Sequence, residues 1–138
     1  MKKLRILFFG GTFVNLDISK KCEKLGAKCW LLDRSIDCMA KNNSNFVNID
    51  FNKKKDVIKF IKKKKINFLY TSQSDSGIKT LGYLNSMLNL NGLDYKTADI
   101  LTDKIKIRKI LSRKGFLQPI YFISKKHFEI KKKIKNKK

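Results

Sequence analysis

A nearly all-apolar run at residues 4–9 ends in two consecutive glycines, Gly10 and Gly11, followed by Thr12. Short runs of this kind suit a strand that is buried on both faces of a parallel sheet, because no polar alternation marks a solvent-facing side. The run is too short for a signal peptide and has no small-x-small cleavage site. The apolar spacing of residues 13–25 predicts a helix directly after the glycine turn, so the chain begins with a β-α unit.

The same alternation continues over the first ~90 residues, and the full length of 138 residues suits one domain. Further strands are expected at residues 28–32, 46–49 and 66–70, and further helices at 53–65 and 78–90. The first helix is expected to turn Val14, Ile18, Cys22 and Leu25 toward the core and to end at Gly26. Alternating strands and helices predict an α/β fold, a Rossmann-like parallel sheet flanked by helices with right-handed crossovers.

The pattern changes after Gly92. A short helix is expected at residues 96–101, and a second helix, capped by Thr102 or Asp103, is expected to run to Lys114. Pro119 interrupts the extended, apolar residues 116–123. We therefore expect an α/β domain over residues 1–93, linker helices and the start of a truncated second domain over 94–123, and a lysine-rich tail over 124–138.

Candidate functional residues follow the strands, because parallel sheets bind ligands at the carboxyl ends of their strands. The glycine turn departs from the dinucleotide fingerprint G-x-G-x-x-G, because its third glycine is absent. A nicotinamide-binding domain, with Asp33 as the ribose-binding acid, stays open as an alternative to a simple tight turn. The role of Asp75 also has two alternatives, since it either contacts a ligand or caps a helix that starts at Ser76.

The formal net charge is +22, from 33 basic and 11 acidic residues. Only four of the basic residues are arginine, the residue best suited to bidentate contacts with phosphates and bases. Lysine, asparagine and isoleucine are abundant together, which is typical of an AT-rich coding sequence. We interpret most of the charge as lysine on solvated faces, and a nucleic-acid partner is not expected.

The sequence offers few candidate ligands for a metal ion and few candidate residues for a catalytic triad. The three cysteines have no CxxC spacing, and the single histidine, His127, lies in the tail. A zinc site and a Ser-His-Asp triad are therefore disfavoured. Unpaired cysteines favour reduced thiols in the cytoplasm, and no window reaches the ~18 apolar residues of a membrane span.

The order of several short motifs resembles the N-terminal part of ATP-grasp carboxylate–amine ligases, a family that includes carbamoyl-phosphate synthetase-like and purine-biosynthetic enzymes. The similar segments are residues 6–11, 24–28, 66–71, 74–77 and 88–92. The most specific segment begins Leu101-Thr102-Asp103-Lys104 and continues through Arg108, Leu111, Gly115 and Pro119. It is similar to the family pattern T-D-K-x-x-M-R-x-x-L-x-x-x-G-(I/V)-x-x-P, and the resemblance covers residues 4–123.

The resemblance implies site residues and cofactors. It implies that Lys104 contacts a nucleotide phosphate, where a compact ammonium group neutralises developing charge. It also implies that the substrate-facing loops contain Gly10, Gly11, Thr12, Ser72, Ser74 and Asp75. ATP and Mg²⁺ are the implied cofactors of the complete enzyme, and no residue of this chain is assigned a catalytic role.

The sequence departs from the family because several of the family's ATP-binding and metal-binding features have no match in the similar segments. The family's second lysine, its glycine-rich flap and its Mg²⁺ ligands lie downstream of the segments matched here. We therefore expect a ligase fragment that is inactive alone and needs a separate polypeptide, or self-association through residues 116–123. The alternative is a stand-alone Rossmann-like module that binds a nucleotide or another small molecule.

Overall fold

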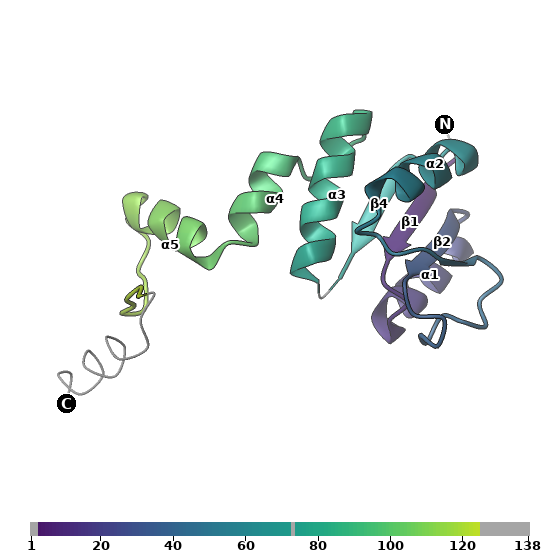
Figure 1. The fold of residues 1–138 in the computed structure, drawn as a ribbon, viewed down its shortest axis with the longest axis horizontal. Helices are drawn as coiled ribbons and strands as arrows, with labels where there is room; N and C mark the ends of the chain where they lie inside the picture. Colours follow the sequence, from purple (N-terminus) through teal and green to yellow (C-terminus); the bar gives the residue numbers. More distant parts are fainter. Residues whose placement is uncertain (1–2, 73, 125–138) are drawn as a thin grey trace. The chain divides into compact units, whose positions relative to one another are not determined.

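The computed structural model describes residues 3–72 and 74–124 (Figure 1). The elements, in chain order, are β1 (Arg5–Phe9), α1 (Phe13–Lys24), β2 (Lys28–Asp33), β3 (Phe46–Asn48), α2 (Lys54–Lys64), β4 (Phe68–Thr71), α3 (Asp75–Leu88), α4 (Tyr95–Leu101) and α5 (Lys104–Arg113). Every strand and helix expected from the sequence is present, and no end differs from its expected position by more than three residues.

Within the described residues, the four strands form one parallel sheet in the order β3-β2-β1-β4. Strand β1 lies at the centre, where Leu7 is in register with Trp30 of β2 and with Leu69 of β4. The order places the ends of β1 and β4 side by side, although residues 10–67 lie between the two strands in sequence. The α/β, Rossmann-like prediction is confirmed.

Each face of the sheet has its own apolar core, because successive side chains of a strand point to opposite faces. Leu7 and Phe9 of β1 pack on one face with buried side chains of α2 and α3, among them Val57 and Leu84. On the other face, β1 packs with partly buried residues of α1. The result is a layered arrangement of helices, sheet and helix, and the continuous apolar run of β1 reflects burial on both sides.

The buried side of α1 differs from the prediction. Leu25, expected to face the core, is 89% exposed, whereas Asn15 and Ser19 are fully buried. Leu25 is the C-cap residue of α1, followed by Gly26 with a φ of 89°, so the chain has already left the helical path that would carry its side chain inward. Ile18 and Cys22 pack partly buried against the core as expected, but the fully buried residues of α1 are the polar pair Asn15 and Ser19.

The chain divides into two compact units, Met1–Ile107 and Arg108–Lys138. In the first unit, α4 packs closely on α3, since a Cβ on Gly82 would lie 2.4 Å from the Cβ of Ala98. In the second unit, the Arg108 guanidinium lies 5.2 Å from the ring centroid of Tyr121. The expected boundary after residue 93 stays a prediction, and the lysine-rich tail, with His127, lies outside the described residues except for Ser124.

Over the described ranges, no helix is both long and apolar enough to cross a membrane.

We expect Cys29 to resist alkylation in the native protein. Its side chain is fully buried on β2, and burial raises the pKa of its thiol to about 12. Almost no thiolate therefore forms at pH 8, and thiolate is the reactive species. Iodoacetamide labelling followed by peptide mass spectrometry should leave Cys29 unmodified until denaturant is added. Labelling of Cys29 at the rate of the partly exposed Cys22 would contradict this expectation.

Candidate functional site

The glycine turn after β1 is shaped by both of its glycines. Gly10 has a φ of 99°, a conformation that side-chain-bearing residues rarely adopt. Gly11 is buried under the loop that follows β2, and a Cβ at this position would lie 2.3 Å from the Sγ of Cys38. The carbonyl of Gly11 accepts a hydrogen bond from the backbone N–H of Ala40 at 3.2 Å. The first glycine therefore bends the chain, and the second allows the loop to close over it.

The carboxylate of Asp33, at the end of β2, accepts hydrogen bonds from backbone N–H groups of the protein. One carboxylate oxygen accepts the N–H of Gly11 at 2.6 Å, and the other accepts the N–H of Ser35 at 2.9 Å. The bond from Gly11 joins the end of β1 to the end of β2. A dinucleotide-binding site needs this carboxylate to bind the ribose. Because both oxygens already accept backbone hydrogen bonds, the structure favours the simpler role in which Asp33 stabilises the glycine turn.

Asn15 is the residue that most firmly joins the loops of this edge. Its side-chain amide donates to the carbonyls of Phe9 and Gly10, both at 2.8 Å, and its Oδ1 accepts from the hydroxyl of Ser72 at 2.7 Å. The glycine turn and the loop after β4 are thus connected through one buried side chain. The sequence analysis missed Asn15; its only local signal is an asparagine in the first turn of the helix that follows the glycines.

An open pocket of about 370 Å³ lies at the carboxyl ends of β1 and β4. Its lining residues are Phe9, Gly10, Thr12, Asp33, Arg34, Phe51, Asn52, Ser72, Ser74 and Ser76. Of the residues assigned to the substrate from the resemblance, Gly10, Thr12, Ser72 and Ser74 line this pocket together. Gly11, whose N–H donates to Asp33, is not among the lining residues, and neither are Asp75 and Lys104.

Two helices begin at this pocket, and hydroxyl side chains cap both. Thr12 Oγ1 accepts the N–H of Asn15 at 3.3 Å at the start of α1, and Ser74 Oγ accepts the N–H of Gly77 at 3.0 Å at the start of α3. The N-cap of α3 is therefore Ser74, and the alternative in which Asp75 capped a helix starting at Ser76 is wrong. Helix N-termini carry partial positive charge.

The pocket can bind but has little capacity for acid–base chemistry. The titratable side chains that line it are Asp33, whose oxygens are occupied by backbone N–H groups, and Arg34. Arg34 and the two helix N-termini favour a polar or anionic ligand. Throughout residues 3–72 and 74–124, no group of three or more His, Cys, Asp or Glu side chains could hold a metal ion.

The Thr102-Asp103-Lys104 segment forms the turn between α4 and α5. Thr102 is the C-cap of α4, and its hydroxyl donates to the carbonyl of Ala98 at 2.8 Å. Asp103 Oδ1 accepts the N–H groups of Ile105 and Lys106 at 2.9 and 3.1 Å, which caps α5. Of the two expected caps, Asp103 has this role. Lys104 is the first residue of α5 and is exposed.

Asp99 fixes α4 against its neighbours in the first unit. Its carboxylate pairs with Lys79 of α3 at 3.5 Å and with Lys106 of α5. The hydrogen bond from Lys106 holds the pKa of this carboxyl below its usual value. Lys106 is therefore occupied by a structural contact, and it differs in this from Lys104, which has no ion pair among the described residues.

No family model matches the sequence, and no curated protein matches it. Two solved structures are similar to the chain. Phosphoribosylglycinamide synthetase from Anaerococcus prevotii has a TM-score of 0.68 and 20% identity over 99% of this chain. N5-carboxyaminoimidazole synthetase from Staphylococcus aureus, complexed with ADP, has a TM-score of 0.72 and 20% identity over 96% of this chain.

Both similar structures are ATP-grasp ligases. The chain therefore has the fold of the N-terminal domain of ATP-grasp ligases, as the order of the sequence motifs predicted. It spans 35% and 36% of the lengths of the two enzymes.

Proposed function

We propose that this chain supplies the substrate-facing domain of an ATP-dependent carboxylate–amine ligase. The observation that carries the proposal is the pocket at the carboxyl ends of β1 and β4, where the glycine turn and the loop after β4 meet in a fold shared with ATP-grasp ligases. Ligands of parallel sheets bind at this edge. In the proposed enzyme, Gly10, Thr12, Ser72 and Ser74 contact the substrate, Gly11 maintains the turn, and Asp75 lies beside the contact residues.

Lys104 is proposed to contact a phosphate of ATP. Its exposed position at the start of α5, set by the Asp103 cap, leaves the ammonium group available to a ligand. ATP supplies the phosphoryl group that activates the carboxylate, and Mg²⁺ supports that transfer. The ligands of Mg²⁺ and the flap over the phosphates are proposed to lie outside the described residues.

The remaining part of the ATP-grasp fold is the proposed partner, as a separate polypeptide or through self-association. The chain spans about a third of each similar enzyme, which supports a need for further domains. Apolar side chains of the second unit are strongly exposed, with Phe116 at 63%, Leu117 at 100% and Ile120 at 84%. Exposed apolar surface of this kind is typical of an interface. The proposed location is the cytoplasm, and nucleic acid has no part in the proposal.

The first test is to read the source DNA beyond codon 138, in all frames and in neighbouring genes. A glycine-rich flap followed by acidic and asparagine metal ligands would support the ligase. The two polypeptides can then be purified and mixed, and ADP release can be measured with candidate carboxylates and amines. If no such sequence exists, the stand-alone binding module becomes the better proposal.

In the assembled enzyme, we expect Lys104→Ala to lower the rate of ADP release by about tenfold, because a positive charge is lost beside the transferred phosphate. A coupled ADP-release assay measures this. Lys109→Ala is the matched control, since it removes another exposed lysine of α5. Equal rates of ADP release for the two variants would show that Lys104 does not contact ATP. A separate result would refute the expected inactivity of the fragment: ATP turnover by the 138-residue chain alone at a rate above that of its Lys104→Ala variant.

A further inference from the structure

The turn between α3 and α4 contains the pair Asn91-Gly92, which has no role in the proposed function. Both residues are exposed. An asparagine that precedes glycine is chemically labile, because the backbone nitrogen of the glycine can attack the side-chain amide and no side chain blocks the approach. A fold slows this reaction when it holds the side-chain amide, or the N–H that follows it, in a hydrogen bond.

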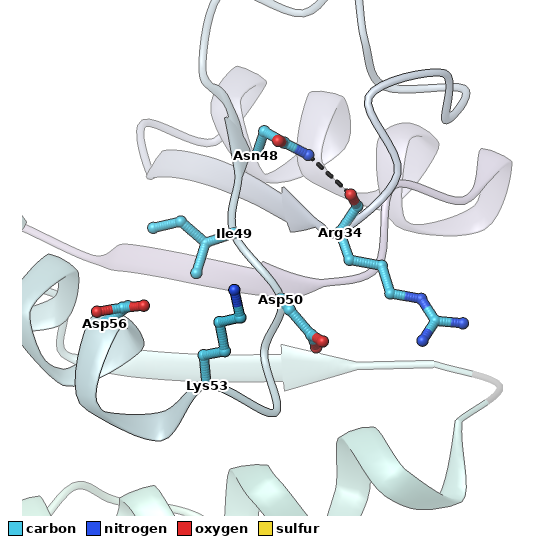
Figure 2. A pocket seen from close by; sticks show the side chains of 6 residues that line it. All are labelled: Arg34, Asn48, Ile49, Asp50, Lys53 and Asp56. Atoms are coloured by element: carbon cyan, nitrogen blue, oxygen red, sulfur yellow. Dashed lines mark hydrogen bonds between the residues drawn. The ribbon is translucent and has the colours of Figure 1, made fainter.

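Most asparagine side chains of the described residues are held in this way. Figure 2 shows one of them, Asn48, which lines a second pocket of about 280 Å³ together with Arg34. Its amide donates to the carbonyl of Arg34 at 2.9 Å. The side chain of Asn91, in contrast, makes no hydrogen bond within the described part of the chain.

The N–H of Gly92 is also without a hydrogen bond to any described residue. Asn89 has an unbonded side chain as well, but the next N–H, that of Leu90, donates to the carbonyl of Asn85 at 3.0 Å. The same is true at position 42, where the next N–H is bonded at 2.8 Å. Among the described asparagines, Asn91 alone combines a free side-chain amide with a free N–H after it.

One buried residue of α3 holds both ends of this turn. Asn85 is 3% exposed. Its carbonyl accepts the N–H of Leu90 at 3.0 Å, and its side-chain amide donates to the carbonyl of Leu93, also at 3.0 Å. Asn91 and Gly92 lie between these two hydrogen bonds. They therefore form an exposed tip whose length is fixed from both sides.

The turn requires glycine at position 92. The φ of Gly92 is 141°, and a Cβ at this position would lie 2.7 Å from Nδ2 of Asn85. Residues with a side chain rarely adopt this φ, and the close contact leaves no space for one. The residue that the turn requires is thus the one that leaves Asn91 most open to attack.

We propose that Asn91 is a site of spontaneous deamidation, and that isoaspartate at this position releases the turn from Asn85. The nitrogen of Gly92 loses its proton and forms a bond to Cγ of Asn91, while the Cγ–Nδ2 bond breaks and the nitrogen leaves as ammonia. Water then opens the cyclic imide at either carbonyl, which gives aspartate or isoaspartate. The reaction needs water alone, and the proposal does not depend on ligase activity.

Isoaspartate adds one carbon atom to the main chain between the two hydrogen bonds of Asn85. Because the turn passes so close to Asn85, the longer chain cannot keep both bonds. We expect the amide of Leu90 to exchange with solvent at least about tenfold faster in the isoaspartate form. Asn91→Asp adds the negative charge without the extra atom, so its Leu90 exchange should stay within about threefold of that of the unmodified chain.

The test is a timed incubation of the 138-residue chain in mildly alkaline buffer, both native and unfolded in urea, followed by peptide mass spectrometry. In the native chain, Asn91 should deamidate at least about tenfold faster than Asn43, which precedes serine and accepts the N–H of Asn45 at 2.8 Å. The native rate at Asn91 should lie within about threefold of the rate in urea, because the fold does not protect the tip.

Isoaspartate is detected with a protein isoaspartyl methyltransferase and labelled S-adenosylmethionine, and hydrogen exchange at Leu90 is measured on the same aged sample. Asn91→Gln is the matched control, because its longer side chain forms a cyclic imide far more slowly. After the same incubation, this variant should take up methyl label only at other positions and should keep its original Leu90 exchange rate.

Three results would each contradict the proposal. Native protection of Asn91 by more than about tenfold relative to urea would show that the fold holds the tip. Equal native rates at Asn91 and Asn43 would remove the special status of this pair. Unchanged Leu90 exchange in the isoaspartate form would show that the turn absorbs the extra atom without releasing Asn85.

Discussion

Asn15→Ala is expected to lower the free energy of unfolding by about 2–4 kcal/mol. The side chain is fully buried and makes three hydrogen bonds, two to carbonyls of the glycine turn and one to the Ser72 hydroxyl. Alanine leaves these buried groups without partners, and each unsatisfied group costs about 1–3 kcal/mol, partly offset by relaxation. Urea denaturation followed by circular dichroism measures the loss.

Ser19→Ala is the matched control for this substitution. Ser19 is equally buried in α1, but its hydroxyl donates only to the carbonyl of Leu16 in the same helix, at 2.8 Å. Its removal should cost about 1 kcal/mol or less. Asn15→Ala should also broaden or shift the amide signals of Ser72 and Ser74, while Ser19→Ala should not. Equal stabilities for the two variants would show that Asn15 does not join the loops.

Gly11→Ala is expected to destabilise the protein by about 1–3 kcal/mol, the usual cost of overpacking. The added methyl group would lie 2.3 Å from Cys38 Sγ and 3.0 Å from its Cβ. The loop after β2 must then move away from the glycine turn. Thermal and urea denaturation would measure the loss of stability. Small anions should also bind more weakly to the pocket at the carboxyl ends of β1 and β4, because the glycine turn lines it.

A double-mutant cycle separates this contact from other effects of Gly11→Ala. Cys38→Ala removes the Sγ that the new methyl group would meet, so the double variant should be more stable than the sum of the single effects predicts, by about 1 kcal/mol. Only partial recovery is expected, because the Cβ of residue 38 remains 3.0 Å away. Strict additivity would place the strain elsewhere than at Cys38.

The sheet could be predicted from the sequence because its signals are local and strong. The apolar run of β1 is uninterrupted, and the helices between the strands have clear apolar stripes, such as Val57 and Ile61 of α2. Gly10 and Gly11 mark the turn without ambiguity. The short motifs from residue 6 to Pro119 added the fold relationship that the two solved structures support.

The connections within the site could not be predicted in the same way. Asn15 was missed because apolar spacing detects only apolar burial, and its partner Ser72 is 57 residues away. Asp33 resembled a ligand-binding acid until the N–H groups of Gly11 and Ser35 were found on its oxygens. Hydrogen bonds of this kind depend on the register of the sheet, which brings distant loops to one edge.

Arg34 contributes its side chain to the lining of both pockets. An anion that engages the guanidinium from one side withdraws it from a ligand on the other side. If an anion bound in each pocket, thermodynamic reciprocity would require each anion to weaken the affinity for the other by the same factor. The edge of the sheet would thus behave as a pair of linked sites, and the linkage would vanish in a chain with glutamine at position 34.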